Sequence, residues 1–377
     1  MIIAVPTEIG AGETRVALTP SAVALLVKDG HEVRVQRGAG FASGFTDSQY
    51  IDKKATIVDD RGALIHEAEV ILQVRVDGQQ DSQHFKAGQI VIGFADPLSS
   101  AVANLALAEK GVTLLSMELI PRITRAQAID ALSSQANLAG YKAVIRAADI
   151  LGKILPMMIT AAGTIQPARV FVVGAGVAGL QAIATAKRLG AVVSAIDVRP
   201  EVAQQVESLG GKFVMPPVQA SGEGGYAKEL TEEQKALQQK MMADTVADSD
   251  VVVTTALIPG RPAPKLVSAE MVERMRPGSV VVDMAAERGG NCALTEPGKI
   301  IVHNGVTIVG ETNLTSQSAH DASSMYAGNL VKLIQHLTGK TRQITWNMAD
   351  EITAGVVVCK DGQVVHPQVK KAMGIAQ

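Results

Sequence analysis

The sequence has few cysteines and few aromatic residues. Its 377 residues include two cysteines, Cys292 and Cys359, which are too few for a disulfide framework and suit a reducing compartment. We interpret each of them as a small buried residue. Aromatic residues make up 3% and hydrophobic residues 47%, which indicates an aliphatic α/β protein. The seven histidines lie scattered without ligand spacing, so we predict no metal site and no nucleophilic triad.

Neither sign of charge prevails, because 35 basic and 37 acidic residues leave a net charge of −2. This balance gives no electrostatic reason to expect nucleic acid or an anionic membrane as a partner. No apolar run reaches the roughly 18 residues of a membrane span. The N-terminal MIIAVPTEIG lacks the basic region of a signal peptide and predicts a first strand. We expect a chain that is soluble by itself, which leaves room for a membrane-bound partner.

The length favours two domains. Short apolar strands alternate with helical patterns over residues 1 to about 125, which predicts a parallel sheet; the strands are 2–5, 33–36, 70–74, 90–94 and 112–116, and two of the helices are 21–28 and 99–110. A mostly helical stretch, 132–158, would bridge the domains until Pro156 breaks or kinks it. Further strands are predicted at 170–173, 192–196, 212–215, 251–254, 280–282 and 307–309, followed by a helix at 325–337 and a hairpin at 356–365 that turns at Asp361-Gly362.

Residues 169–199 contain one dinucleotide-binding pattern. A buried strand ends at Gly174-Ala175-Gly176-Val177-Ala178-Gly179, and a helix, Gly190 and a second strand follow. Gly174 allows a tight turn, Gly176 lets the backbone approach a pyrophosphate, and Gly179 lets helix and strand pack closely. The N-terminus of the helix presents free N–H groups to the anion. Because strand, glycines, helix, strand and acid follow in order, we predict a Rossmann site.

Asp197 follows the second strand and can accept hydrogen bonds from a ribose diol. A carboxylate there repels a 2′-phosphate, so the residue favours NAD(H) over NADP(H). Arg199 is an opposing signal, since an arginine nearby can serve a 2′-phosphate. We give the carboxylate the greater weight.

Polar side chains recur along PRITRAQAIDALSSQAN, residues 121–137. Thr124 and Gln127 have the spacing of a capping box, and Gln127, Asp130, Ser133 with Ser134, and Asn137 would then share one helix face. A solvated face is one interpretation. The other is a ligand-binding cleft, because the stripe precedes the predicted crossover between domains. In that cleft Arg122 would pair with Asp130 and hold a nicotinamide carboxamide.

Three other features leave alternatives open. Residues 215–235 place Gly222, Gly224 and Gly225 around Tyr226, which suits either a loop that folds over a ligand or a surface excursion. Residues 254–264, TTALIPGRPAP, either line the adenosine end of a cleft or form a proline-rich turn. Arg15 either binds a carboxylate or pairs with a nearby acid.

The chain resembles the NAD(H)-binding component, domain I, of proton-translocating nicotinamide nucleotide transhydrogenase. The resemblance covers essentially the whole length through GETRVALTP, PRITRAQAIDALSSQANLAGYKAV, GAGVAGLQAIATAKRLGA, GGYAKE, TTALIPGRPAPKL and GGNCALTEPGKI. It implies an α/β fold in which two Rossmann-like domains with parallel sheets flank a nucleotide cleft. It also implies a homodimer and a Re/Si-specific, proton-translocating enzyme that is active only with partner subunits. NADH bound to this chain would pass a hydride to NADP⁺ on a separate domain III, which is attached to the membrane domain II.

The resemblance also implies roles for individual residues. Arg122 and Asp130 would orient the NADH nicotinamide with Ser133 beside them, Gln127 would bridge toward NADP⁺, and Tyr226 would belong to the closing lid. The cofactor-binding residues would be Arg122, Ile123, Thr124, Gln127, Ala128, Ile129, Asp130, Ser133, Gly174, Ala175, Gly176, Val177, Gly179, Asp197, Val198, Arg199, Gly225, Gln238 and Leu257. Ala175 to Val177 would hold the pyrophosphate, Asp197 to Arg199 the adenosine ribose, and Gln238 with Leu257 the adenosine pocket.

Alanine dehydrogenase resembles the transhydrogenase family in fold and in much of this sequence pattern. It is therefore the main alternative identification. Oxidising an amino acid needs a carboxylate anchor and a proton acceptor, whereas hydride exchange between nicotinamides moves no proton at the reacting carbons. Arg15 matches the substrate arginine of alanine dehydrogenase. Arg75, Ala95 and Glu287 stand where its lysine, histidine and aspartate belong. The chain also departs from transhydrogenases, because Gln73 stands where relatives often have lysine.

We therefore expect a first domain of residues 1–135 with 318–377 and an NAD-binding Rossmann domain of residues 136–317. One fingerprint per chain requires the second nucleotide to come on a partner. The chain would be cytoplasmic, peripheral to the inner membrane through its partners, and either a separate subunit or an excised domain. An amino-acid dehydrogenase and a regulatory NAD-sensing module are the alternatives.

Overall fold

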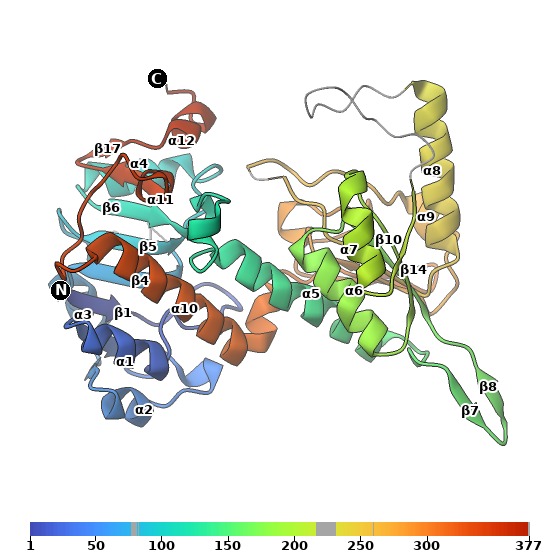
Figure 1. Ribbon diagram of the computed structural model, residues 1–377, viewed down its shortest axis with the longest axis horizontal. Helices are drawn as coiled ribbons and strands as arrows, with labels where there is room; N and C mark the ends of the chain where they lie inside the picture. The colour runs from blue at the N-terminus through green and yellow to red at the C-terminus, as the bar shows by residue number, and fades with distance from the viewer. Residues whose placement is uncertain (77–80, 82, 216–230, 259, 376–377) are drawn as a thin grey trace. The chain divides into compact units, whose positions relative to one another are not determined.

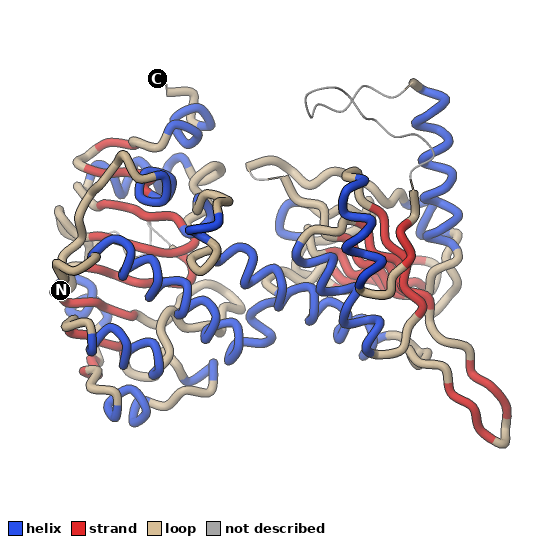
Figure 2. The backbone as a smooth tube through the Cα atoms, in the orientation of Figure 1, coloured by secondary structure: helices blue, strands red, loops and turns tan. Residues whose placement is uncertain are grey.

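The computed structural model describes residues 1–377 except 77–80, 82, 216–230, 259 and 376–377, and it leaves out the side chains of residues 232, 234–236 and 238. The described residues divide into two compact units, Met1–Gln135 with Thr315–Gln377, and Ala136–Leu314. Each unit has its own sheet with helices on both faces, as Figures 1 and 2 show. The predicted α/β class with mainly parallel sheets is confirmed. Among the described residues, no helix combines the length and apolar character needed to cross a membrane.

The sheet of the first unit has the order β17-β16-β6-β5-β4-β1-β2-β3. The strands are β1 (Ile2–Val5), β2 (Glu32–Gln36), β3 (Thr56–Val58), β4 (Val70–Arg75), β5 (Ile90–Phe94), β6 (Thr113–Ser116), β16 (Val357–Lys360) and β17 (Gln363–Val364). The first six are parallel, and β16 pairs antiparallel with both β6 and β17. Asp361 and Gly362 turn the β16–β17 hairpin at φ 51° and 80°, which confirms the predicted turn.

Helices cover both faces of this sheet. Side chains alternate along each strand, so Ile3 and Val5 pack into one buried cluster while Ala4 packs into the other. Leu26 and Leu330 from two neighbouring helices fill the first cluster. The helices are α1 (Pro20–Lys28), α2 (Asp47–Asp52), α3 (Arg61–Glu67), α4 (Ala101–Glu109), α10 (Ala319–Thr338), α11 (Glu351–Val356) and α12 (Pro367–Ala372), of which α1 and α10 lie side by side (Figure 1).

The sheet of the second unit has the order β11-β10-β9-β12-β13-β15-β14. Its strands are β9 (Arg169–Val173), β10 (Val192–Ile196), β11 (Lys212–Phe213), β12 (Val251–Thr254), β13 (Val280–Asp283), β14 (Ile300–His303) and β15 (Val306–Val309). Without the antiparallel edge strand β14, this is the 3-2-1-4-5-6 strand order of dinucleotide-binding sheets. The order reverses between β9 and β12, where such folds bind their ligands.

The helices of this unit also pack on two faces. Ala143 and Ile183 belong to one buried cluster, and Val246 and Val272 belong to the other. They lie on α5 (Ala131–Ile150), α6 (Val177–Arg188), α8 (Glu232–Ala247) and α9 (Ala269–Glu273), and α7 is Ala203–Ser208. All strands predicted from the sequence are present, with ends that shift by up to two residues.

The stretch 132–158, predicted to be mostly helical with a break or kink at Pro156, is helical in its first part, but its helix ends earlier than predicted. Helix α5 ends at Ile150, and Leu151 and Gly152 follow it directly. The strands β7 (Met158–Thr160) and β8 (Gly163–Ile165) then form an antiparallel hairpin. Gly163 has φ 131°, which suits glycine at the turn. The hairpin β7–β8, the strands β3 and β14, and the short helices α2, α3, α7, α9, α11 and α12 were not predicted.

Candidate functional site

The glycine-rich turn after β9 has the geometry that a dinucleotide requires. Gly174 has φ 99°, which a residue with a side chain adopts only with strain. A Cβ atom at Gly179 would lie 1.8 Å from the carbonyl oxygen of Gly174, whereas a Cβ at Gly176 would have nothing within 4 Å. Helix α6 starts at Val177, and no side chain caps it. The open space at Gly176 and the uncapped helix fit a pyrophosphate, whose charge a helix N-terminus stabilises.

Asp197, at the end of β10, joins the second strand to this turn. Its Oδ2 accepts the N–H of Ala175 at 2.7 Å, and its carboxylate accepts three N–H bonds from Arg199 at 2.9 to 3.1 Å. Burial acts to raise the pKa of Asp197, but the bonds from Arg199 and Ala175 outweigh it and lower the pKa below its ordinary value. A carboxylate offers about four acceptor positions. A ribose diol would therefore bind by replacing side-chain bonds of Arg199.

Two residues that the sequence analysis did not single out fix the loop after β12, and one of them also bonds to the glycine-rich turn. Thr255 donates its hydroxyl to the carbonyl oxygen of Gly174 at 3.1 Å. The side chain of Asn291, which is fully buried, accepts from the N–H of Ala256 and donates to the carbonyl oxygens of Ala256 and Pro264. Both stand in motifs already noted, TTALIPGRPAP and GGNCALTEPGKI, but a side chain bonded to a distant main chain leaves no periodic signal.

The first unit carries the polar stretch between β6 and α5. A short 3₁₀ helix, Thr124–Ala126, follows Ile123, and Ala126 and Ile129 are buried in the core of this unit. Arg122, Gln127 and Ala128 are exposed. The two apolar anchors thus fix the stretch to the core and leave the amide of Gln127 at the surface.

Asp130 is the N-terminal cap of α5. Its carboxylate accepts the N–H of Ser133 at 2.9 Å and the hydroxyl of Ser133 at 2.6 Å. The predicted shared helix face is wrong at its start, because α5 begins at Ala131 and both Gln127 and Asp130 precede it. No side chain caps the 3₁₀ helix at Thr124, so the capping box proposed for Thr124 and Gln127 is not formed there.

The expected pair of Arg122 and Asp130 is not observed. Within the described ranges, the hydrogen bonds of the Asp130 carboxylate go to Ser133, and no ion pair joins it to Arg122. The side chain of Leu257 is 53% exposed beyond β12, and Val198 is 87% exposed. Gly225 and Tyr226 lie outside the described residues, as does the side chain of Gln238. The part of the chain that the structure describes contains no cluster of three or more potential metal ligands.

Arg15 pairs with an acid, which decides between the two alternatives for this residue. Its Nη2 lies 2.6 Å from Oε2 of Glu13, and its Nη1 donates to Gln135 at 2.8 Å. Burial acts to raise the pKa of Glu13, but the bonds and charge of Arg15 outweigh it and lower the pKa to about 2. The Nε of Arg75 also donates to Glu13, at 3.2 Å. Arg15 and Glu13 therefore form a buried structural ion pair within the first unit.

Gln73 lies in a second buried polar group. Its Nε2 donates to Oδ2 of Asp81 at 3.0 Å, and the same oxygen lies 2.7 Å from Nη2 of Arg61. A lysine at position 73 would bring a second cation to a carboxylate that Arg61 already neutralises. The uncharged amide of Gln73 can bond to Asp81 without disturbing the charge balance between Asp81 and Arg61.

Glu8 gives the first unit a measurable dependence on pH. Its carboxylate accepts the N–H groups of Val74 and Arg75 at 2.6 and 3.0 Å. Burial raises the pKa of Glu8 to about 7, although these N–H groups act to lower it. The folded protein therefore holds this proton more tightly than the unfolded chain does, so its contribution to stability falls as the pH rises from the unfolded pKa near 4.5 to about 7.

We expect the free energy of unfolding to fall between pH 5 and pH 8 by about 2 kcal/mol more in the parent protein than in Glu8→Gln. Urea titrations of both proteins at the two pH values measure this difference. His31 and His366, whose pKa values burial lowers, shift stability in the opposite direction, but they are the same in both proteins. Equal pH dependence in the two proteins would contradict the assignment.

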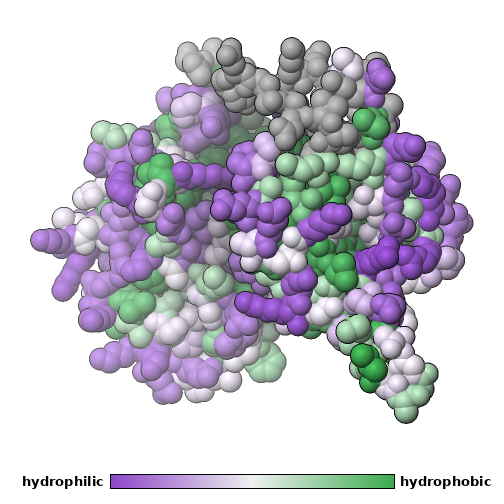
Figure 3. Space-filling view, turned by 45° about the vertical axis from the view of Figure 1, so that its right-hand side comes forward, coloured by the Kyte–Doolittle hydropathy of each residue, from purple (hydrophilic) through white to green (hydrophobic). Residues whose placement is uncertain are grey.

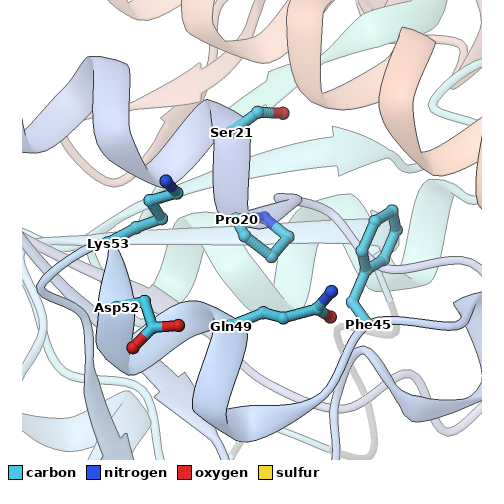
Figure 4. Close-up of a pocket in the computed structure, with 6 residues that line it drawn as sticks. All are labelled: Pro20, Ser21, Phe45, Gln49, Asp52 and Lys53. Carbon is cyan, nitrogen blue, oxygen red and sulfur yellow. The ribbon is translucent and has the colours of Figure 1, made fainter.

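A surface hollow of about 400 Å³ lies beside α1 and α2 and contains none of the predicted site residues. It is lined by Pro20, Ser21, Phe45, Gln49, Asp52 and Lys53, and Figure 4 shows the side chain of Gln49 pointing toward Phe45. Phe45 stacks on His320 with ring centroids 4.7 Å apart, and Gln49 accepts the N–H of Thr46 at 2.8 Å. Because these groups serve local packing and helix capping, we do not assign the hollow a ligand.

Comparisons with known proteins agree over nearly the whole chain. Residues 4–139 match the family model "Alanine dehydrogenase/PNT, N-terminal domain", and residues 143–367 match "Alanine dehydrogenase/PNT, C-terminal domain". The chain is 46% identical to the first part of NAD(P) transhydrogenase subunit alpha from Rhodospirillum rubrum, over 97% of this chain and 98% of that protein. A solved transhydrogenase from Sinorhizobium meliloti matches with a TM-score of 0.86 and 44% identity, over 97% and 99%. Alanine dehydrogenase of Bacillus subtilis is 31% identical over 77% and 72%.

Proposed function

Because the chain belongs to the alanine dehydrogenase/PNT family, we propose that it is the NAD(H)-binding subunit of a proton-translocating, Re/Si-specific transhydrogenase. The chain binds NADH, and a hydride passes between this nucleotide and NADP⁺ on a separate protein domain. Turnover requires that partner, and a membrane domain couples it to proton translocation.

The gap in similarity carries this proposal. The Rhodospirillum rubrum transhydrogenase subunit is 46% identical over nearly the full length of both proteins, whereas the alanine dehydrogenase of Bacillus subtilis is 31% identical over about three quarters. The site supports the same choice. Ala95 and Glu287 stand where the resemblance places the catalytic histidine and aspartate of alanine dehydrogenase, and Arg15 is engaged with Glu13. Hydride exchange between two nicotinamides needs no acid or base.

The second unit holds NAD(H) in this proposal. Gly174, Ala175, Gly176, Val177 and Gly179 bind the pyrophosphate, and Asp197 with Val198 and Arg199 binds the adenosine ribose. The ion pair of Arg199 with Asp197 supports NAD(H) rather than NADP(H), because this guanidinium is already matched to a carboxylate. NADP(H) then binds to the partner domain.

The first unit supplies the groups for the nicotinamide end. Arg122, Asp130 and Ser133 bind and orient the carboxamide, and Gln127 extends toward the second nucleotide. The exposure of the Gln127 side chain supports its role, since a group that reaches a second nucleotide must lie at the surface. Ile123, Thr124, Ala128 and Ile129 contribute their main chain, while Gly225, Tyr226, Gln238 and Leu257 complete the lid and the adenosine pocket.

The hairpin β7–β8 supports a homodimer. It consists of two three-residue strands whose residues are all exposed, and Met158, Ile159 and Ile165 are 45%, 71% and 44% exposed. Figure 3 shows hydrophobic surface, in green, on the hairpin that protrudes at the lower right. An isolated two-stranded hairpin is marginally stable in water. A second copy of the chain that covers this arm would stabilise it, and a closed pair is the commonest arrangement of identical chains.

We expect Ile159→Asp to convert the dimer into a monomer, because it places a charge in the apolar contact that the hairpin makes with the second copy. Sedimentation velocity of the isolated chain at micromolar concentration measures the change. The matched control is Val102→Asp on α4, since Val102 is 69% exposed and lies in the other unit. An unchanged sedimentation coefficient in Ile159→Asp would remove the hairpin from the interface.

A mixed assay tests the proposed function. The isolated chain should bind NADH but reduce NADP⁺ only after addition of the NADP-binding domain of a transhydrogenase. Reduction without that domain would contradict the partner requirement, and NADH production from alanine and NAD⁺ would favour the amino-acid dehydrogenase. Binding of NADH with no hydride transfer in either assay would favour a regulatory NAD-sensing module.

A further inference from the structure

The main chain around Gln127 and Asp130 is held by a residue about 200 positions away in the sequence. Asn329 lies on α10 and is 7% exposed. Its Nδ2 donates to the carbonyl oxygen of Ala128 at 3.0 Å, and its Oδ1 accepts the hydroxyl of Ser134 at 2.7 Å. One amide side chain thus bonds to both sides of Asp130.

Helix α10 is a rigid base for these bonds. Tyr326, Leu330 and Leu333 around Asn329 are fully buried in the main core of the first unit. The hydroxyl of Tyr326 also donates to the carbonyl oxygen of Gln73 at 2.8 Å, which ties the helix to β4. Packed cores resist displacement, so α10 is held in a fixed position relative to the sheet. The bond from Asn329 therefore also holds the exposed stretch in a fixed position relative to the sheet.

A second tie joins the same stretch to the C-terminal part of the unit. Nη1 of Arg125 lies 3.0 Å from Oδ2 of Asp350, the cap of α11, and His336 of α10 lies 2.9 Å from Oδ1. The side chain of Arg125 is 60% exposed, so solvent weakens this ion pair. The bond of Asn329 to Ala128 is the stronger restraint, because it is partly buried and comes from a side chain that is itself buried, so solvent competes with it less.

We propose that Asn329 is a positioning residue that sets the main-chain path from Gln127 to Asp130 and thereby the fit of the nicotinamide end of NADH. In this role it acts through the main chain of residues 127–130 and not by contact with the nucleotide. The role rests on the proposed function, in which Gln127 and Asp130 act at the nicotinamide.

The test compares two ligands and two variants. Asn329→Asp keeps the size and the acceptor for Ser134 but replaces the donor to Ala128 by an oxygen. Gln335→Glu is the matched control, because it makes the same amide-to-carboxylate change on α10, where Gln335 donates to Asp29 at 2.9 Å. Isothermal titration of the full-length parent and of both variants with NADH and with ADP-ribose, which lacks the nicotinamide, gives six affinities.

In Asn329→Asp we expect the Kd for NADH to rise about tenfold, as for one lost hydrogen bond, while the Kd for ADP-ribose stays within about twofold. Gln335→Glu should change neither. Equal weakening of both ligands in Asn329→Asp, or no weakening of either, would overturn the role. A parent protein that binds ADP-ribose as tightly as NADH would instead overturn the proposed nicotinamide contacts, and the role of Asn329 with them.

Hydrogen exchange provides a readout that needs no ligand. Peptides that cover residues 123–131 should exchange about tenfold faster in Asn329→Asp than in the parent, while peptides from α10 and β4 keep their rates. If Asn329→Asp does not fold, Asn329→Ser, which is smaller and uncharged, is measured in the same way. Unchanged exchange at residues 123–131 in a folded variant would show that Asn329 does not hold this stretch.

Discussion

Gly179→Ala is expected to lower the melting temperature of the second unit by about 10 °C, through a loss of about 3 kcal/mol. The reason is a steric clash with a main-chain atom, which no side-chain movement can remove. The added Cβ would lie 1.8 Å from the carbonyl oxygen of Gly174, so α6 would have to move away from the end of β9. The first turn of α6 also packs closely on α5, where a Cβ at Gly140 would lie 2.1 Å from the carbonyl oxygen of Ala178. Calorimetry of the isolated chain measures the shift.

Gly176→Ala is the control, because it makes the same chemical change three residues earlier. Its φ is −76° and its Cβ would meet nothing within 4 Å, so the melting temperature should stay within about 1 °C. Its Cβ would occupy the space assigned to the pyrophosphate, so the Kd for NADH should rise at least about 30-fold. If both variants lose stability, or if Gly176→Ala binds NADH normally, the separate roles of the two glycines are wrong.

These two glycines show why the second unit was predictable from sequence. The constraints that define the turn are local, since Gly174, Gly176 and Gly179 act within six consecutive residues and Asp197 follows one strand later. Periodicity gives the flanking strands, and β9 and β10 run as the apolar segments indicated. The strand order then follows from the rules for parallel sheets with helical crossovers.

The structure of the polar stretch before α5 was harder to predict, because two helix-capping signals compete within ten residues. Thr124 with Gln127 and Asp130 with Ser133 are both spaced three apart, and Asp130 starts the helix. Burial decides between them: Ala126 and Ile129 must both reach the core, which a short 3₁₀ turn allows. Sequence spacing carries no information about this choice.

The hairpin β7–β8 and the contacts of Asn329 are two further features that could not be predicted from the sequence. Ile159, Thr160, Thr164 and Ile165 are β-branched residues around Gly163, which is a hairpin signal, but the preceding helical pattern masked it. Asn329 has no local signal, because its partner Ala128 lies 201 residues away. Contacts of this kind appear only when the fold is known.

Gln127→Asn is expected to slow hydride transfer in the mixed assay by about 100-fold while the protein stays folded. The shorter side chain withdraws the amide by about 1.5 Å, and a misplacement of about 1 Å in a reacting complex costs about two orders of magnitude in rate. The side chain of Gln127 is exposed and α5 is capped by Asp130, so stability should not change. Rapid mixing of the NADH-loaded chain with the NADP⁺-loaded partner domain measures the first turnover.

Two comparisons make this result specific to the site. Gln363→Asn makes the same change at an exposed position on β17, and its rate should equal that of the parent. Asp130→Asn keeps an oxygen that can cap α5 but removes the charge, so it should slow transfer with little loss of stability. A parental rate in both Gln127→Asn and Asp130→Asn would mean that the stretch held by Asn329 does not act on the nicotinamide. A slow rate in Gln127→Asn with an unchanged Kd for NADH would instead place its effect in the transfer step, since a group that bound NADH equally before and during transfer would change affinity as well.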